Sequence, residues 1–182
     1  MKLNAKVLSQ EQYLIPIKIV LVYLAWKVFN YYALIPGTAL NHFWNTLVAD
    51  LGNLYAIVSS FILTLSGLKA SASGININLI DSNKQVWVQE HCLAMPAMIV
   101  FTGAVLLFRG IWREKLLFLA IGLAGIVFIN LMRLILVSYA WIYFSPPFFR
   151  IVHSYVYVLI TYAFIFLMLA WWMNRVIKKN NS

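Results

Sequence analysis

Three side chains in this sequence have the chemistry of an acyl-transfer site: Cys92, Arg133 and His153. A thiolate is a strong nucleophile, and a nearby imidazole can take its proton and later give it to a leaving amine. A guanidinium keeps its charge under protein conditions, so it can stabilise the thiolate and the oxyanion that forms on attack at a carbonyl. Together the three predict acyl transfer through a thioester.

Neighbouring residues support this site or compete with it. Asn130 lies three residues before Arg133, on the same face of a helix, and we expect it to orient the arginine. His91 directly precedes Cys92 and is a competing base, although its side chain would leave the helix in another direction. Each residue also has a structural interpretation. A lone cysteine is commonly a buried small side chain, and Arg133 could pair with Asp50.

The composition predicts that lipid surrounds these residues. Of the 182 residues, 63% are hydrophobic and 10% charged, against about 25% charged in soluble domains. The net charge of +9 comes from short basic clusters between apolar runs, which is typical of membrane proteins and argues against a nucleic-acid partner. With one cysteine, the chain can form no intramolecular disulfide.

Five apolar runs are candidate spans, since a membrane helix needs about 20 mostly apolar residues. We expect an all-α integral membrane protein, with residues 1–182 forming a single membrane domain and the first run retained rather than cleaved. The runs are Tyr13–Ile35, Phe43–Leu65, Leu93–Phe108, Leu116–Ala140 and His153–Met173.

Basic residues in short loops predict the orientation. The 109–115 connection and the 175–179 tail carry Lys and Arg and should be cytoplasmic, so residues 66–91 and 144–152 face outward. Arg133 lies 18 residues beyond Lys115, about 27 Å of helix, which puts it at the outer level of Cys92 and His153.

One signal disagrees with this orientation. Five spans would put the N-terminus outside, yet it carries Lys2 and Lys6. The first run could instead lie along the membrane surface with its lysines reaching toward water.

The outer segment 66–91 has the pattern of a small β-hairpin. Ile75, Ile77 and Leu79 alternate with asparagines, residues 81–84 favour a turn, and residues 85–90 form the second arm. A lone hairpin is marginal in water, so we expect it to lie over the helix bundle and to lead directly into Cys92.

The order of these elements resembles the exosortase/archaeosortase family. The matching segments are Glu90-His-Cys92, Asn130-Leu-Met-Arg133 and Val152-His153-Ser, within residues 66–173. The chain departs from the family pattern after the cysteine. Leu93-Ala94-Met95 stands where small residues and a glycine are common, which puts the local loop geometry in doubt. The short length resembles compact members.

The resemblance implies a membrane-embedded cysteine protease/transpeptidase that processes C-terminal sorting signals of exported proteins. Such signals consist of a short motif, a transmembrane helix and a basic tail. On this reading Cys92 is the nucleophile, His153 the proton carrier and Arg133 the thiolate or oxyanion stabiliser. The expected location is a bacterial or archaeal cell membrane, multi-pass, with the active site facing outward. No metal and no organic cofactor is implied.

The alternative from another class is a non-enzymatic membrane subunit or small transporter, with Arg133 as a ligand or counter-ion site. It predicts that Cys92 is dispensable and that the outer hairpin docks a partner. Other hydrolase chemistries fit less well, because the sequence has no HExxH-type metal cluster and no Gly-x-Ser-x segment of an intramembrane serine protease.

Overall fold

The computed structural model describes the backbone over residues 5–107, 111–144 and 157–181. Side chains are described from residue 17 onward within these ranges, except at 91, 157–158, 173 and beyond 175. The helices are α1 (Ala5–Ala33), α2 (Ala39–Leu65), α3 (Met95–Leu107), α4 (Trp112–Tyr143) and α6 (Tyr157–Asn181). Each predicted apolar run overlaps one of them. By length and composition, α2 and α4 are long and apolar enough to cross a membrane.

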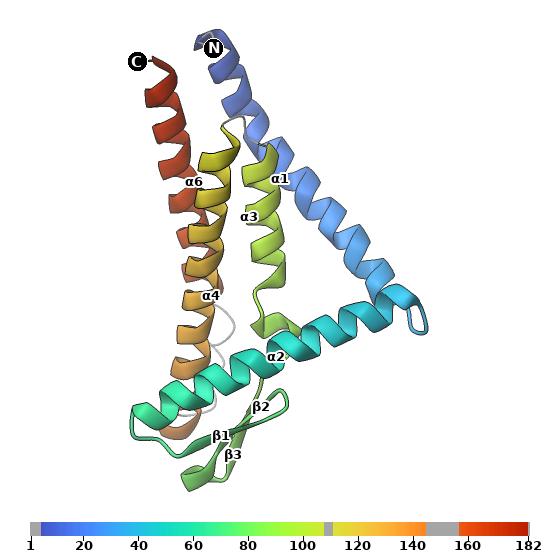
Figure 1. Cartoon of the computed structure of the whole chain (residues 1–182), viewed down its shortest axis with the longest axis vertical. Helices are drawn as coiled ribbons and strands as arrows, with labels where there is room; N and C mark the ends of the chain where they lie inside the picture. Colours follow the sequence, from blue (N-terminus) through green and yellow to red (C-terminus); the bar gives the residue numbers. More distant parts are fainter. Residues whose placement is uncertain (1–4, 108–110, 145–156, 182) are drawn as a thin grey trace.

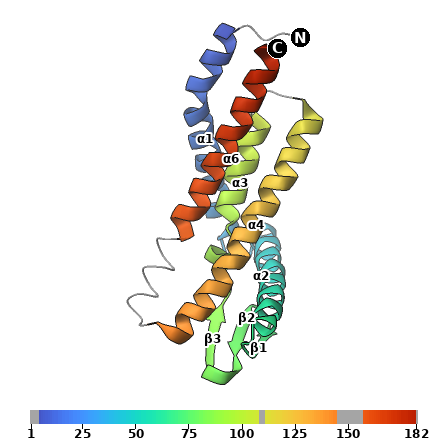
Figure 2. The same cartoon turned by 90° about the vertical axis from the view of Figure 1, so that its left-hand side faces the viewer.

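Three helices, α3, α4 and α6, run side by side, and α1 leans against α3 (Figures 1 and 2). Small residues let these helices approach closely. A Cβ on Gly122 of α4 would lie 2.1 Å from the Phe101 ring of α3, and one on Gly125 would lie 2.5 Å from the Phe164 ring of α6. The bundle therefore depends on glycine where α4 meets its neighbours.

Two lysines stabilise the end of α3. Lys18 of α1 donates to the Leu107 carbonyl at 3.4 Å, and Lys115 of α4 donates to the Leu106 carbonyl at 3.2 Å. These carbonyls have no partner within the helix, and cations are favoured at a helix C-terminus. Lys18, one of two lysines inside the first apolar run, thus makes a contact between helices.

Helix α2 runs across the bundle instead of along it (Figures 1 and 2). It begins where the Thr38 hydroxyl accepts a hydrogen bond from the Asn41 N–H at 3.1 Å, a common N-cap. Its first half packs on α1, with the Trp44 and Trp26 ring centroids 5.4 Å apart.

A small antiparallel sheet lies on the other side of α2, in the order β1 (Ala70–Ser73), β2 (Asn76–Leu79), β3 (Lys84–Trp87). The sequence pattern predicts two arms at 75–79 and 85–90. The structure has a third strand, β1, and β3 ends at Trp87. The alternating Ala and Ser of β1 carry little hydrophobic signal. The strand is held by pairing with β2 and by the Thr64 hydroxyl, which donates to the Ala70 carbonyl at 3.1 Å.

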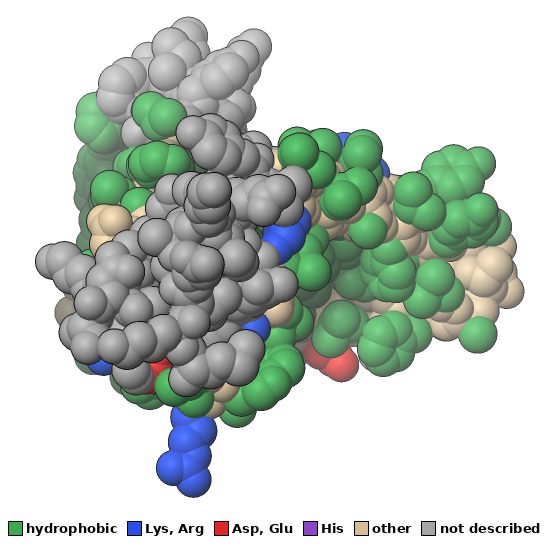
Figure 3. All heavy atoms as spheres, turned by 90° about the horizontal axis from the view of Figure 1, so that it is seen from above, with side chains coloured by type: hydrophobic (Ala, Val, Ile, Leu, Met, Phe, Trp, Pro, Cys, Tyr) green, Lys and Arg blue, Asp and Glu red, His purple; other side chains and the backbone are tan. Residues whose placement is uncertain are grey.

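The ends of the helices separate into two groups (Figures 1 and 2). The start of α1, the end of α3, the start of α4 and the end of α6 lie at one end of the molecule. The sheet lies at the opposite end, and α2 crosses next to it. Seen from the end that carries the helix termini, hydrophobic side chains cover the arm that α1 and α2 form (Figure 3).

Candidate active site between the sheet and helix α4

Cys92 ends the short 3-10 turn η2 (Glu90–Cys92), which joins the sheet to α3. The turn forms because the Cys92 N–H donates to the Gln89 carbonyl at 2.7 Å. The side chain is buried, at 6% exposure. Its Sγ lies 4.0 Å from the Trp87 carbonyl oxygen, within reach of a weak S–H donor. The predicted nucleophile therefore stands directly between strand β3 and the start of α3.

Arg133 lies on α4 and is also buried, at 9% exposure. Asn130, one turn earlier, donates from Nδ2 to the Cys92 backbone carbonyl. The sequence assigned Asn130 to orienting the arginine. The structure shows that Asn130 joins α4 to the cysteine segment across 38 positions of sequence. One turn of α4 thus contributes both the buried cation and a contact that holds the thiol-bearing turn.

Tyr55 of α2 is a third contributor, which the sequence pattern does not single out. Its side chain is buried, and its hydroxyl lies beside the Asn130 side chain. It sits in an apolar run where a tyrosine is unremarkable in composition, so only the tertiary contact identifies it. Helix α2 is therefore part of the wall behind the site.

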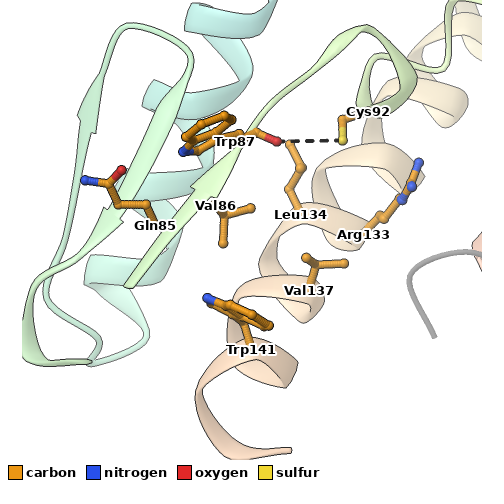
Figure 4. Close-up of a pocket in the computed structure, with 8 residues that line it drawn as sticks. All are labelled: Gln85, Val86, Trp87, Cys92, Arg133, Leu134, Val137 and Trp141. Atoms are coloured by element: carbon orange, nitrogen blue, oxygen red, sulfur yellow. Dashed lines mark hydrogen bonds between the residues drawn. The ribbon is translucent and has the colours of Figure 1, made fainter. Parts of the chain in front are cut away.

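A cavity of about 160 Å³ separates β3 from α4, and Cys92 and Arg133 both line it (Figure 4). Drug-sized pockets usually exceed about 300 Å³, so this cavity accepts a group the size of one or two side chains. Sequence reasoning missed the rest of its wall, because β3 and α4 are brought together only in the fold. The remaining lining residues are Gln85, Val86, Trp87, Leu134, Val137 and Trp141.

Lys84 contacts one of these lining residues, Trp141. Its Nζ donates to the Trp141 carbonyl at 2.7 Å and lies 5.3 Å from the centroid of the same indole. Trp141 lines the cavity, so this lysine joins the sheet to the α4 side of the cavity.

The histidines contribute less to the described geometry. His153 lies outside the described residues, and so does the side chain of His91. His42 is exposed near the start of α2, at the end remote from α4 (Figure 1). Asp50 is also exposed and forms no ion pair with any described residue, so the alternative pairing of Arg133 with Asp50 is not present.

Comparison with known families agrees with the resemblance seen in the motifs. A family model described as transmembrane exosortase matches residues 13–172, which include Cys92, Asn130, Arg133 and His153. No curated protein and no solved structure matches the chain. Because the match covers nearly the whole sequence, the chain belongs to the transmembrane exosortase family and is a membrane protein of the kind that processes sorting signals.

Proposed function

We propose that this protein is a membrane-embedded cysteine peptidase/transpeptidase that cleaves C-terminal sorting signals of exported proteins at the outer face of the cell membrane. The observation that carries the proposal is the shared cavity of Cys92 and Arg133. A buried charge in a membrane helix is costly, so Arg133 is a candidate functional residue whose surroundings decide its role. Because Cys92 lines the same cavity, the Arg133 charge can stabilise its thiolate and the oxyanion that forms on attack.

In the proposed reaction, the Cys92 thiol gives its proton to His153 and the sulfur attacks the scissile carbonyl. A C–S bond forms, and the carbonyl oxygen becomes an oxyanion that the Arg133 guanidinium stabilises. The oxyanion then collapses, the C–N bond breaks, and the leaving amine takes the proton from His153. Water or an amine next attacks the thioester, and its proton returns through His153 to the departing thiolate.

The burial of both groups supports this chemistry. Water is scarce around side chains that are 6% and 9% exposed, and charges attract more strongly at low dielectric than in water. Asn130 acts as a positioning residue, because its hydrogen bond to the Cys92 carbonyl fixes the turn that carries the thiol.

Strand β3 offers a place for the substrate segment. In the described sheet β3 is an edge strand, paired with β2 on one side and next to the cavity on the other (Figure 4). An extended peptide can add to such an edge through main-chain hydrogen bonds, with one or two side chains entering pockets. On this proposal the sorting motif lies between β3 and α4, with its scissile carbonyl at Cys92.

The test compares Cys92→Ala and Cys92→Ser with the unmodified protein in the native host. The readout is the size and membrane release of exported proteins that end in a helix and a basic tail. We expect both variants to accumulate uncleaved, membrane-retained precursors at normal enzyme abundance, because alanine has no nucleophile and a serine hydroxyl is a much weaker nucleophile than a thiol. Ser138→Ala is the matched control, since this buried hydroxyl donates only to Leu134 on its own helix.

Unchanged processing in Cys92→Ala would overturn the proposal and favour the transporter or subunit alternative, with Arg133 as the ligand or counter-ion site. The same assay assigns the base. Loss of processing in His153→Gln but not in His91→Gln supports the proton carrier proposed above, and the reverse result moves that role to His91.

A further inference from the structure

Helix α2 is long and apolar enough to cross a membrane, yet it runs across the other helices (Figures 1 and 2). We propose that α2 does not cross the membrane but lies along its outer surface, with one side in the acyl chains. The chain then crosses through α1, α3, α4 and α6. This inference concerns the lipid partner of α2 and is independent of the cysteine chemistry.

The side of α2 that contacts the sheet is opposite an exposed apolar side. A Cβ on Gly52 would lie 3.0 Å from Cγ2 of Ile75, so this face of α2 rests on the sheet. Phe43 and Phe61 stand nine residues before and after Gly52, about two and a half turns, which places both on the far side. They are 63% and 62% exposed, and Leu54, near the same side, is 55% exposed. The sheet therefore faces outward and the phenylalanines face the membrane interior.

A polar edge borders the apolar side. His42, Thr46 and Asn53 lie about 80–120° around the helix from Gly52, at about 100° per residue, and all three are exposed. Asp50 is also exposed and lies about 160° from Gly52, on the same side as the two phenylalanines. If α2 crossed the membrane, this carboxylate would stand near the middle of the helix, facing lipid without an ion pair in the described part of the chain, which is strongly unfavourable. In the interface the polar edge reaches headgroups and water, and the carboxylate lies at the boundary and not at the costly bilayer centre.

Contacts at both ends hold α2 in this direction. Near its start, Trp44 packs against Trp26 and Phe29 of α1, with centroid distances of 5.4 and 5.6 Å. At its end, the Tyr139 hydroxyl of α4 donates to the Ser66 hydroxyl at 2.7 Å. The crossing direction is therefore built into the packing of the protein.

The depth of α2 agrees with an interfacial position. It lies next to the lower end of α3, whose 13 residues span about 20 Å (Figure 1). A surface helix buries its apolar side about 5–10 Å into the headgroup and acyl boundary. In a hydrocarbon core about 30 Å thick, such a helix stands roughly 20–25 Å from the opposite boundary.

This arrangement also accounts for the N-terminal lysines. With α2 on the surface, the start of α1 lies on the same side as the start of α4 and the end of α6 (Figures 1 and 2). Lys6 then joins Arg113, Lys115 and Arg175 on the cytoplasmic side, as the distribution of basic residues predicts. Five spans would place this basic N-terminus outside, whereas four spans place it inside.

The single native cysteine makes the test direct, because Cys92→Ser gives a cysteine-free chain. Single cysteines are then introduced as Pro36→Cys between α1 and α2, Ser73→Cys in β1 and Ile111→Cys before α4, all at exposed positions. Intact cells are treated with a membrane-impermeant maleimide. We expect labelling at positions 36 and 73 from outside, and at 111 only after lysis. Labelling at 36 only after lysis would show that α2 crosses the membrane.

A second measurement tests the depth of α2 in the membrane independently of these three variants. Spin labels on Phe43→Cys and Phe61→Cys in proteoliposomes report depth through their accessibility to oxygen and to a water-soluble nickel complex. A surface helix gives both labels similar depths. A spanning helix would separate these positions by up to about 27 Å, and opposite accessibility ratios at the two sites would overturn the proposal.

Discussion

The two halves of α4 each contain a buried cation, and the surroundings of the two cations differ. Lys115 is 6% exposed, donates to the Leu106 carbonyl and lies 5.1 Å from the centroid of the Trp112 ring. Arg133 is 9% exposed and lines the cavity that contains Cys92. One cation completes the end of a neighbouring helix, and the other faces a space next to a nucleophile. Burial of a charge alone therefore does not indicate function; its surroundings do.

The packing of other elements against α4 also differs between its two halves. In the half of α4 toward Lys115, the approach of Gly122 to Phe101 leaves no room for even a methyl group. In the half with Arg133, α4 lies beside η2, which precedes α3 in the chain. Ala94, between η2 and α3, adopts a left-handed φ of 52°. Helix-to-helix contact is replaced there by contact with a strand, and the cavity lies at this junction.

The largest difference should appear when each of the two buried cations is replaced by glutamine in a separate variant. Arg133→Gln should lower processing of sorting signals by about 10²–10³-fold at normal abundance, as expected for loss of an oxyanion-stabilising donor. Lys115→Gln should lower the thermal midpoint in detergent while the activity of the folded fraction stays near that of the unmodified protein. Equal losses of activity in both variants would contradict the functional role of Arg133 and the structural role of Lys115.

A smaller effect is expected at the contact that joins α4 to the cysteine turn. Asn130→Leu keeps roughly the volume of the side chain but removes the donor to the Cys92 carbonyl. Leaving that buried carbonyl without its donor should cost about 1–3 kcal/mol of stability. We expect kcat to fall about tenfold with little change in KM, and the rate of Cys92 alkylation by a small maleimide to change in parallel. An unchanged alkylation rate would mean that Asn130 does not position the thiol.

The smallest effect should distinguish two lysines of the sheet segment. Lys84→Met removes the contacts with Trp141 at the cavity wall, so we expect a loss of about 1 kcal/mol and a few-fold decrease in processing. Lys69 forms an exposed ion pair with Asp81 at 3.4 Å, and such pairs contribute little. Lys69→Met should therefore match the unmodified protein in both assays, and a larger effect there than at Lys84 would contradict a supporting role for the contact of Lys84 with Trp141.

Part of the site can be predicted from local sequence because its chemistry is rare in a membrane. A lone cysteine where the outer segment meets a helix and an arginine inside an apolar run are both visible without a structure, and the fold brings Cys92 and Arg133 to one cavity. Their neighbours Tyr55 and Trp141 carry no comparable signal. An aromatic residue in an apolar run is ordinary, so its role depends on which element it meets.

The sequence by itself determined which segments are helical and that lipid surrounds them, because hydropathy and helix length are local properties. It also determined the residue types that can perform acyl transfer. Only the tertiary structure decided the direction of α2, the third strand and the contact of Asn130 with the Cys92 carbonyl. By length and composition α2 could span a membrane as α4 could, so hydropathy does not give the direction of α2. The contacts of Gly52 with Ile75 and of Trp44 with Trp26 set that direction, because they join residues far apart in the chain.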